Sequence, residues 1–306
     1  MHIGQKIRER SKLSWFILFE RKKLIQKKSL KLPRNDKIFI FFTTDLEYNP
    51  KYPKKASYDG FKNYLEILQT NNIPSTFFVC GDFAMDNKKD IIDLSNNENE
   101  IGSHSYNHIN LGPNVWWGKK FIPSVGYETR KKSILKNHEV LSKILKRDPV
   151  SFRAPYLSID GITLKILNKA GYKIDSSVNN FLFGLPTVPY HPSKNNTLKD
   201  GDINIIEFFI TCSLSKTFGI KSLNLDYKRI TFFNSNDLPK DIKIVNENMY
   251  LSPYIVILTH PWEFSRYFKS NPNERINVLS DFIHTLKKDF NVEFLRIEDI
   301  FTVQDK

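Results

Sequence analysis

The sequence is poor in cysteine, with two thiols, Cys80 and Cys212, in 306 residues. Each thiol ends an apolar run, STFFVC or IIEFFITC, where a small buried hydrophobic side chain fits. We therefore expect unpaired core thiols rather than a disulfide. Free thiols are typical of a reducing compartment, which favours a cytoplasmic location.

Long apolar runs are also scarce. The longest early run, WFILF at residues 15–19, is too short for a secretory signal, and no small-residue cleavage site follows it. No stretch approaches the roughly 20 apolar residues that a transmembrane helix needs. Neither pattern indicates export or a membrane span, so the cytoplasmic expectation stands.

Positive charge is concentrated at one end of the chain. Of the net charge of +13, residues 1–37 contribute +9, from twelve Lys and Arg residues and three acidic ones. The remainder is nearly balanced, which argues against a uniformly basic groove and a nucleic-acid partner.

Residues 1–36 are expected to form a basic N-terminal helical extension, separate from a domain at 37–306. Their mixture of Lys and Arg with apolar residues suits a helix lying on an anionic membrane, at the inner surface. The alternative is a basic helix or tail beside the domain, because five consecutive apolar residues wrap around a helix instead of forming a stripe. Both interpretations stay open.

From Lys37 onward, short apolar runs alternate with segments of helical periodicity. Several runs are apolar at consecutive positions, as in parallel strands that are covered on both faces. The alternation predicts an α/β fold with a parallel sheet, open or closed. The predicted strands are KIFIFFTTD, IPSTFFVC, NEIGSH, VSFRAP, YKIDSS, INIIEFFI, YIVILTH and NVEFLRI, and the helices are YDGFKNYLEILQT, ETRKKSILKNHEVLSKIL, DGITLKILNKA and NERINVLSDFIHTLKK.

Chemically versatile side chains follow five of the predicted strands. A barrel of parallel strands carries its chemistry at their C-terminal ends, so these residues would face one mouth. They are Asp45, Glu47, His104, His108, Arg153, Asp175 and His260.

The stretch GSHSYNH spaces His104 and His108 four residues apart, which can bring both rings to one side of a helical turn. A catalytic zinc site takes three His or carboxylate ligands and keeps one position open. In the preceding strand, Asp45 and Glu47 project from the same face, and two such carboxylates are costly to bury without a cation or donors. The alternative is a pair of unrelated surface or capping histidines.

Three further residues fit hydrolytic chemistry. Arg153 in FRAPY can hold a carboxylate ionised and oriented, or form a purely structural salt bridge. His260 ends the most apolar strand and is suited to act as an acid or base. Asp175 in KIDSS can orient His260, or serve as a cap or turn residue.

The ordered series TTDLE, GSHSYNH, FRAPY, YKIDSS and LTHPWE resembles the polysaccharide deacetylase family, also called the NodB-homology or carbohydrate esterase family 4 domain. The resemblance covers roughly residues 38–300. It implies a distorted (β/α) barrel, commonly of seven strands, and a divalent metal, usually zinc. The implied activity is hydrolysis of an N-acetyl group on an amino sugar.

The resemblance also implies roles for individual residues. His104 and His108 match the metal-binding histidines, and Arg153 matches the arginine that braces the catalytic base. Asp175 matches the residue that tunes the acid histidine, and His260 matches that acid. Tyr156 and Trp262 are expected beside the substrate, because their motifs place them there.

The chain departs from the family at the first landmark, where the second of two adjacent aspartates is Leu46. Strand geometry points to Glu47 as the replacement ligand and leaves Asp45 as the base. The opposite assignment, with Asp45 on the metal, stays open.

We therefore expect a metal-dependent hydrolase that removes N-acetyl groups from amino sugars of a cell-envelope or extracellular glycan or its precursor. One alternative is a deformylase or other C–N hydrolase acting on a lipid-linked amino sugar. The other is a glycan-binding barrel without catalytic activity, prompted by the missing second aspartate.

Overall fold

The computed structural model describes residues 37–117, 119–178, 189–211, 254–268 and 271–303. The predicted extension at 1–36, its membrane-surface interpretation and Cys212 lie outside the described residues. Cys80 is buried and unpaired, as expected. Within the described ranges, no helix is long and apolar enough to cross a membrane.

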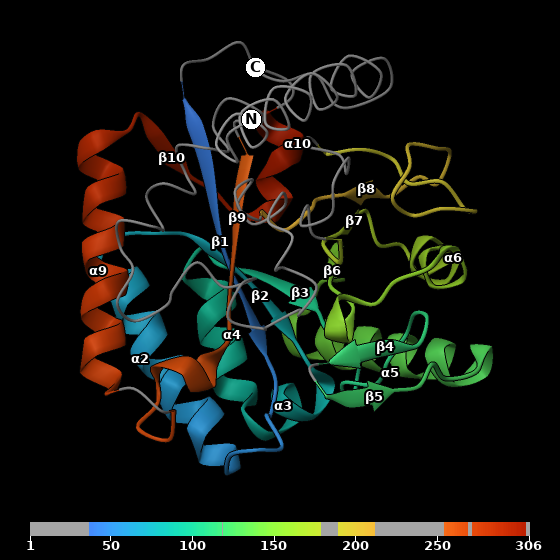
Figure 1. Ribbon diagram of the computed structural model, residues 1–306, viewed down its shortest axis with the longest axis horizontal. Helices are drawn as coiled ribbons and strands as arrows, with labels where there is room; N and C mark the ends of the chain where they lie inside the picture. Colours follow the sequence, from blue (N-terminus) through green and yellow to red (C-terminus); the bar gives the residue numbers. More distant parts are fainter. Residues whose placement is uncertain (1–36, 118, 179–188, 212–253, 269–270, 304–306) are drawn as a thin grey trace, which may run out of the picture.

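A mostly parallel sheet curls into a distorted barrel, which confirms the predicted fold (Figure 1). Seven of its strands lie in the order β9, β1, β2, β3, β6, β7, β8, with every neighbouring pair parallel. Their bounds are β1 Ile38–Leu46, β2 Ser75–Val79, β3 Glu100–Ser103, β6 Ser151–Phe152, β7 Ile174–Asp175, β8 Ile206–Glu207 and β9 Tyr254–Thr259.

Strand β1 shows how the sequence separates the two layers of the core. Its even-numbered apolar residues, such as Ile40 and Phe42, pack in the cluster beneath the helices. Its odd-numbered residues Phe39 and Phe41 pack in the cluster inside the barrel. Because side chains alternate along a strand, the same odd register carries Asp45 to the barrel mouth.

The barrel ends at two special pairings. Strand β10 (Val292–Phe294) pairs with the first half of β1, through Ile38–Ile40, while β2 pairs with the second half. On the other side, the backbone N–H of Thr211, beyond β8, donates to Val256 O of β9 at 3.1 Å. This bond links the short-strand side of the barrel to β9.

Helices cover the outside of the barrel, with α2 and α9 beside β1 and β9 in Figure 1. Asn271 caps α9 by accepting from Asn273 N, and Asp160 caps α6 by accepting from Thr163 N. The helices are α2 Lys54–Thr70, α3 Gly81–Asp86, α4 Lys88–Asn96, α5 Tyr127–Leu145, α6 Gly161–Lys169, α9 Pro272–Asp289 and α10 Ile300–Val303.

The sequence did not predict three small features. Helices α3 and α4 are only six and nine residues long, too short for a clear apolar period. The antiparallel hairpin of β4 (Val115–Trp117) and β5 (Lys120–Ile122) forms a separate two-stranded sheet beside the barrel. This hairpin helps to shape the site.

Candidate active site

The end of β1 supplies two buried carboxylates. Asp45 is 3 % exposed and Glu47 6 %, while Leu46 between them is fully buried in the core beneath the helices. The strand alternation that separates Phe41 from Phe42 therefore also places both carboxylates on the side of the barrel mouth, as the sequence predicted.

The two histidines of GSHSYNH lie in a loop after β3, not in the helical turn that their spacing suggested. Residues 104–110 carry no helical assignment, and Ser105 and His108 have left-handed backbone angles, with φ of 61° and 51°. Such angles cost side-chain-bearing residues free energy, so the surrounding contacts must hold them. The left-handed turn, rather than helical periodicity, brings the two rings to 5.2 Å between centroids.

Glu47, His104 and His108 form one cluster whose potential ligand atoms all lie within 4.8 Å of one another. Glu47 Oε2 contacts His108 Nε2 and lies 3.6 Å from His104 Nε2. This oxygen is buried and accepts no hydrogen bond of normal geometry from the described residues. Two imidazoles and the carboxylate that carries this oxygen are a ligand set that fits a divalent metal with an open coordination position.

The tautomer of His104 suits metal binding. His104 Nδ1 lies 2.8 Å from Arg153 O, a carbonyl that accepts the Nδ1 proton and leaves Nε2 to face Glu47. An imidazole that binds a metal through one ring nitrogen usually donates the N–H of its other ring nitrogen to a backbone carbonyl, a carboxylate or a water molecule. The loop after β6 therefore orients an imidazole that comes from the loop after β3.

Electrostatics in the cluster favour positive charge. Burial acts to raise the pKa of Glu47, but His108 and His104 outweigh it and hold the pKa well below its ordinary value. Burial acts to lower the pKa of His104, but Asp45 and Glu47 reverse that effect and raise it. The two carboxylates thus create an environment in which a cation is stabilised.

Arg153 fixes the orientation of Asp45. The guanidinium is fully buried, and its Nη1 donates to Asp45 Oδ1 at 2.8 Å and to Thr43 Oγ1 at 2.9 Å. Its Nε donates to Ser176 O at 2.9 Å, and its guanidinium carbon, Cζ, lies 4.2 Å from the centroid of the Phe78 ring. With Oδ1 held, Asp45 Oδ2 is directed into the site, 3.9 Å from His104 Nε2.

His260 lies near the same oxygen of Asp45 as His104 does. Its Nε2 is 3.8 Å from Asp45 Oδ2, and its ring packs against Trp262 with centroids 4.6 Å apart. Burial is the main cause that lowers the pKa of His260 to about 4, although Asp45 and Glu47 act in the opposite direction. The neutral imidazole therefore predominates near neutral pH.

The predicted partner of His260, Asp175, has a different environment. Its Oδ1 accepts from Ser177 Oγ at 2.6 Å, and β7 pairs it with Glu207 of β8. Its neighbour Ile174 packs inside the barrel, so strand alternation turns Asp175 toward the outside. The contacts that the structure gives Asp175 are thus with Ser177 and Glu207, and the tuning of His260 by this residue stays a prediction.

Glu263 is a site residue that sequence reasoning missed. Its Oε1 lies 3.9 Å from His260 Nδ1, and Arg275 Nη2 of α9 donates to its Oε2 at 3.2 Å. Burial raises the pKa of Glu263 to about 7, and Arg275 opposes the shift. The signal was present in HPWE, where a carboxylate follows His260 by three residues in a short 3₁₀ turn, η3 (Pro261–Phe264).

The cluster opens into a pocket of about 410 Å³. Tyr156 and Trp262 line it as expected, together with Lys51, Lys120 and Ile122. Tyr156 has a left-handed φ of 59° in the 3₁₀ turn η1 (Pro155–Leu157), and its ring lies 4.5 Å from that of His108. Trp262 is only 3 % exposed, so it packs against His260 more than it offers an open face to a ligand.

The chain is similar to known deacetylases in sequence. Residues 36–174 match the family model described as polysaccharide deacetylase. A peptidoglycan-N-acetylglucosamine deacetylase of Bacillus cereus is 26 % identical over 130 residues, which are 42 % of this chain and 39 % of that protein. The chain therefore matches about two fifths of that relative's length.

Solved structures share the fold. A Mycobacterium smegmatis protein assigned as a polysaccharide deacetylase superposes with a TM-score of 0.63 at 20 % identity, covering 91 % of this chain and 94 % of that one. A mutant of a CE4-family pseudoenzyme of Bacillus anthracis, with restored enzymatic activity, gives 0.52 at 15 % identity, covering 86 % and 67 %. The similarity to the polysaccharide deacetylase family thus covers residues 36–174, and the solved structures share the fold.

Proposed function

We propose that this protein is a metal-dependent hydrolase that removes N-acetyl groups from amino sugars of a cell-envelope or extracellular glycan, or of its precursor. The observation that carries the proposal is the position of Asp45. Its free oxygen lies between the Glu47–His104–His108 cluster and His260, at 3.9 Å from His104 Nε2 and 3.8 Å from His260 Nε2. A nucleophilic water and a leaving amine need groups in this arrangement.

Glu47, His104 and His108 would hold the metal, with zinc as the expected ion. A bound divalent metal lowers the pKa of water and polarises a carbonyl oxygen. The assignment of Glu47 as ligand and Asp45 as base is supported by their contacts, since Glu47 Oε2 faces both imidazoles and Asp45 Oδ1 is held by Arg153.

Asp45 acts as the general base. Arg153 keeps its carboxylate oriented through Oδ1, so that Oδ2 is available to accept the proton of the attacking water. Arg153 is also hydrogen-bonded to Thr43 and Ser176, so the position of its guanidinium does not depend on Asp45 alone. The base is therefore held in a single geometry before substrate binds.

His260 acts as the general acid toward the departing amine. With a pKa lowered to about 4 by burial, it must gain a proton during the reaction, and the neighbouring Asp45 Oδ2 is the source. Glu263 is a positioning residue in this scheme. Its carboxyl group, bound to Arg275, faces Nδ1 of the same ring and stabilises the imidazolium that forms.

The proposal is tested by measuring acetate release from N-acetylated glycans with the purified protein. The zinc-loaded protein should release acetate, chelator should abolish release, and added zinc should restore it. Asp45→Asn should retain zinc binding yet lose activity, whereas His104→Ala should lose both. Full acetate release by both variants would refute the mechanism.

A second candidate function is glycan binding without catalysis. It is favoured by the replacement of the family's second aspartate by Leu46 and by the pseudoenzyme among proteins of this fold. Stoichiometric zinc with turnover excludes this candidate, while glycan binding without acetate release across a substrate panel supports it.

A further inference from the structure

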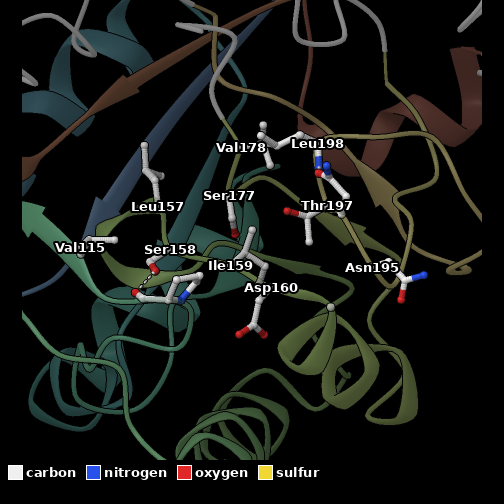
Figure 2. A pocket seen from close by; sticks show the side chains of 13 residues that line it. Val115, Leu157, Ser158, Ile159, Asp160, Ser177, Val178, Asn195, Thr197 and Leu198 are labelled. Atoms are coloured by element: carbon white, nitrogen blue, oxygen red, sulfur yellow. Dashed lines mark hydrogen bonds between the residues drawn. The ribbon is translucent and has the colours of Figure 1, made fainter. Parts of the chain in front are cut away.

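The β4–β5 hairpin presents two different faces. Because side chains alternate along a strand, neighbouring cross-strand pairs point to opposite sides. The pair Val115 and Ile122 points inward, since Ile122 lines the catalytic pocket and Val115 lines a neighbouring hollow (Figure 2). The next pair, Trp116 and Phe121, therefore points away from the barrel, with ring centroids 5.2 Å apart.

This outer face is strongly exposed and aromatic. Trp116 is 62 % exposed and Phe121 is 46 % exposed, and Tyr127 at the start of α5 is a third exposed aromatic residue within twelve positions. Among the side chains that the structure describes, Phe301 is the one other aromatic residue of comparable exposure. Large apolar side chains gathered at one place on a surface mark a site of interaction.

Hydrogen bonds hold the base of the hairpin in place. Ser158 Oγ, in the loop after β6, donates to Pro113 O at 3.0 Å, a bond drawn as a dashed line in Figure 2. On the other strand, Ser124 N donates to Asn114 Oδ1 at 2.7 Å. The outer face is thus formed before any partner binds, so a partner does not have to supply the free energy of ordering it.

The tip of the hairpin is positively charged. Lys119 and Lys120 lie between the two aromatic positions, and residues 101–127 contain no Asp or Glu. Both lysines are exposed, and neither forms an ion pair with any residue in the described ranges. Lys51, which lines the catalytic pocket together with Lys120, is also exposed and without an ion pair there. The partner of this face is therefore expected to carry negative charge.

The area of the aromatic face is small for a protein partner. At their observed exposures, Trp116 and Phe121 together offer on the order of 200 Å². A stable protein interface buries roughly 800 Å² on each partner. A lipid bilayer needs no complementary shape, and it accepts aromatic rings at the level of its headgroups and lysine side chains beside its phosphates. The combination of small area, aromatic rings and unpaired lysines favours a lipid surface.

We propose that the outer face of the β4–β5 hairpin docks on an anionic lipid bilayer. Trp116 and Phe121 lie at the boundary between headgroups and acyl chains, and Lys119 and Lys120 contact the lipid phosphates. This docking does not depend on the proposed function. Because Lys120 and Ile122 also line the catalytic pocket, docking places the pocket beside the membrane surface. Only the consequence for the substrate, a glycan or precursor held at the membrane, rests on the proposed function.

The test is sedimentation of the metal-free, full-length protein with lipid vesicles. Vesicles of equal parts phosphatidylcholine and phosphatidylglycerol should bind the protein more tightly than vesicles of phosphatidylcholine alone. The double variant Trp116→Ala/Phe121→Ala should lower the partition coefficient by at least about tenfold, and Lys119→Glu by about fivefold or more.

The matched controls are Phe301→Ala on α10 and Lys288→Glu on α9, exposed residues on elements that lie away from the hairpin in Figure 1. Both controls should bind vesicles like the wild-type protein. Quenching of tryptophan fluorescence by lipids with brominated acyl chains adds a readout of position. Trp116→Phe keeps an aromatic ring, so it should retain binding and lose part of the quenching.

Unchanged vesicle binding by both hairpin variants, equal binding to the two kinds of vesicle, or no binding by the wild-type protein would overturn the docking surface. So would quenching that Trp116→Phe leaves unaltered. A solution dimer that the aromatic double variant dissolves would assign the face to a second copy of the chain. Binding of a soluble N-acetylglucosamine hexamer, lost in the double variant and without vesicle binding, would assign it to a glycan. Either result also overturns the docking surface.

The vesicle assay requires neither zinc nor turnover, so it separates this inference from the proposed function. Vesicle binding that the hairpin variants weaken, in a protein that releases no acetate from any substrate, would support the docking surface and refute the deacetylase. Acetate release without vesicle binding would do the reverse.

Discussion

The barrel has two unequal halves. In one half, β1, β9 and β2 are nine, six and five residues long, and in the other β6, β7 and β8 have two residues each. The long-strand half carries Asp45 within β1, and Glu47 and His260 directly after β1 and β9, while the short-strand half contributes Arg153. The candidate catalytic groups thus lie at the ends of the longer strands, and the irregular half orients Asp45 through Arg153.

The short-strand half replaces ladder bonds by buried side chains. Glu207 Oε1 accepts from Ser177 N at 3.1 Å and from Val178 N at 2.9 Å, and Ser176 Oγ donates to Phe208 O at 2.7 Å. These bonds join the chain after β7 to β8. Substitutions in the two halves should therefore have different consequences, chemistry in one and stability in the other.

The largest effect is expected in the long-strand half, at the metal cluster. Glu47→Gln should lower kcat/KM by at least about 10³-fold, because a neutral amide is a poor ligand for a divalent cation. Zinc should raise the melting temperature of the wild-type protein and not that of the variant, since only a ligand that binds the folded state stabilises it. Calorimetry with and without zinc measures this, and equal zinc-induced shifts would contradict the assignment of Glu47.

The next effect tests Arg153, a residue that links the halves. Arg153→Met should destabilise the fold by about 3–5 kcal/mol, because Asp45 is left buried without its cation, and should also reduce acetate release. The double variant Arg153→Met/Asp45→Asn should recover part of the free energy of unfolding and none of the activity. Urea denaturation and acetate assays on the same samples separate the two roles. If the double variant is as unstable as Arg153→Met, the instability of Arg153→Met does not come from the buried charge of Asp45.

A pH-dependent effect is expected in the short-strand half. Burial, followed by the charge of Asp175, raises the pKa of Glu207 well above its ordinary value of 4.5. The folded state then binds more protons than the unfolded state above about pH 4.5, so the free energy of unfolding falls as pH rises. Glu207→Gln keeps an oxygen acceptor for Ser177 N and Val178 N and should flatten this slope. Denaturation from about pH 5 to about pH 9 measures it, and parallel slopes would contradict the inference.

A smaller effect of the same sign is expected at the start of β3, at the end of the barrel that lies away from the candidate site. Glu100 of β3 accepts from Thr76 Oγ1 and from Glu298 N, both at 2.8 Å, and burial, followed by Glu298, raises its pKa to about 7. Stability should fall between about pH 4.5 and about pH 7, by at most about 3 kcal/mol. Glu100→Gln should remove that loss while acetate release, which depends on the other end of the barrel, keeps its pH profile. A changed activity profile would show that the two ends are coupled.

Much of the fold follows from the sequence because long, strongly patterned elements carry their own signal. The continuous apolar runs of β1 and β9 predicted parallel strands covered on both faces, and the alternation of Phe41 with Phe42 set the register that aims Asp45 at the mouth. Short elements carry less information. Strands of three residues and helices of six and nine residues cannot show a clear period, so the hairpin, α3 and α4 were missed.

The site was predictable in its residue types and less so in its geometry. The spacing of His104 and His108 suggested a helical turn, whereas left-handed angles at Ser105 and His108 form the loop, and such angles have no reliable signal in a non-glycine residue. The contacts of Asp175 with Ser177 and Glu207 were not foreseen, and its tuning of His260 stays a prediction. The carboxylate at His260 Nδ1, Glu263, depends on a 3₁₀ turn that three-residue spacing alone does not establish.

Residues with left-handed backbone angles around the barrel mouth limit how far the thermal stability of this protein can be raised without loss of activity. Ser105, His108, Tyr156 and Leu157 adopt angles that glycine tolerates better, and Lys146 does the same at the far end of α5. Directed evolution for heat resistance would gain freely from glycine at Lys146. Glycine at His108 would remove a proposed ligand, and glycine at Ser105, Tyr156 or Leu157 would loosen the loops around the candidate site, so a gain in thermal stability there would be expected to reduce activity.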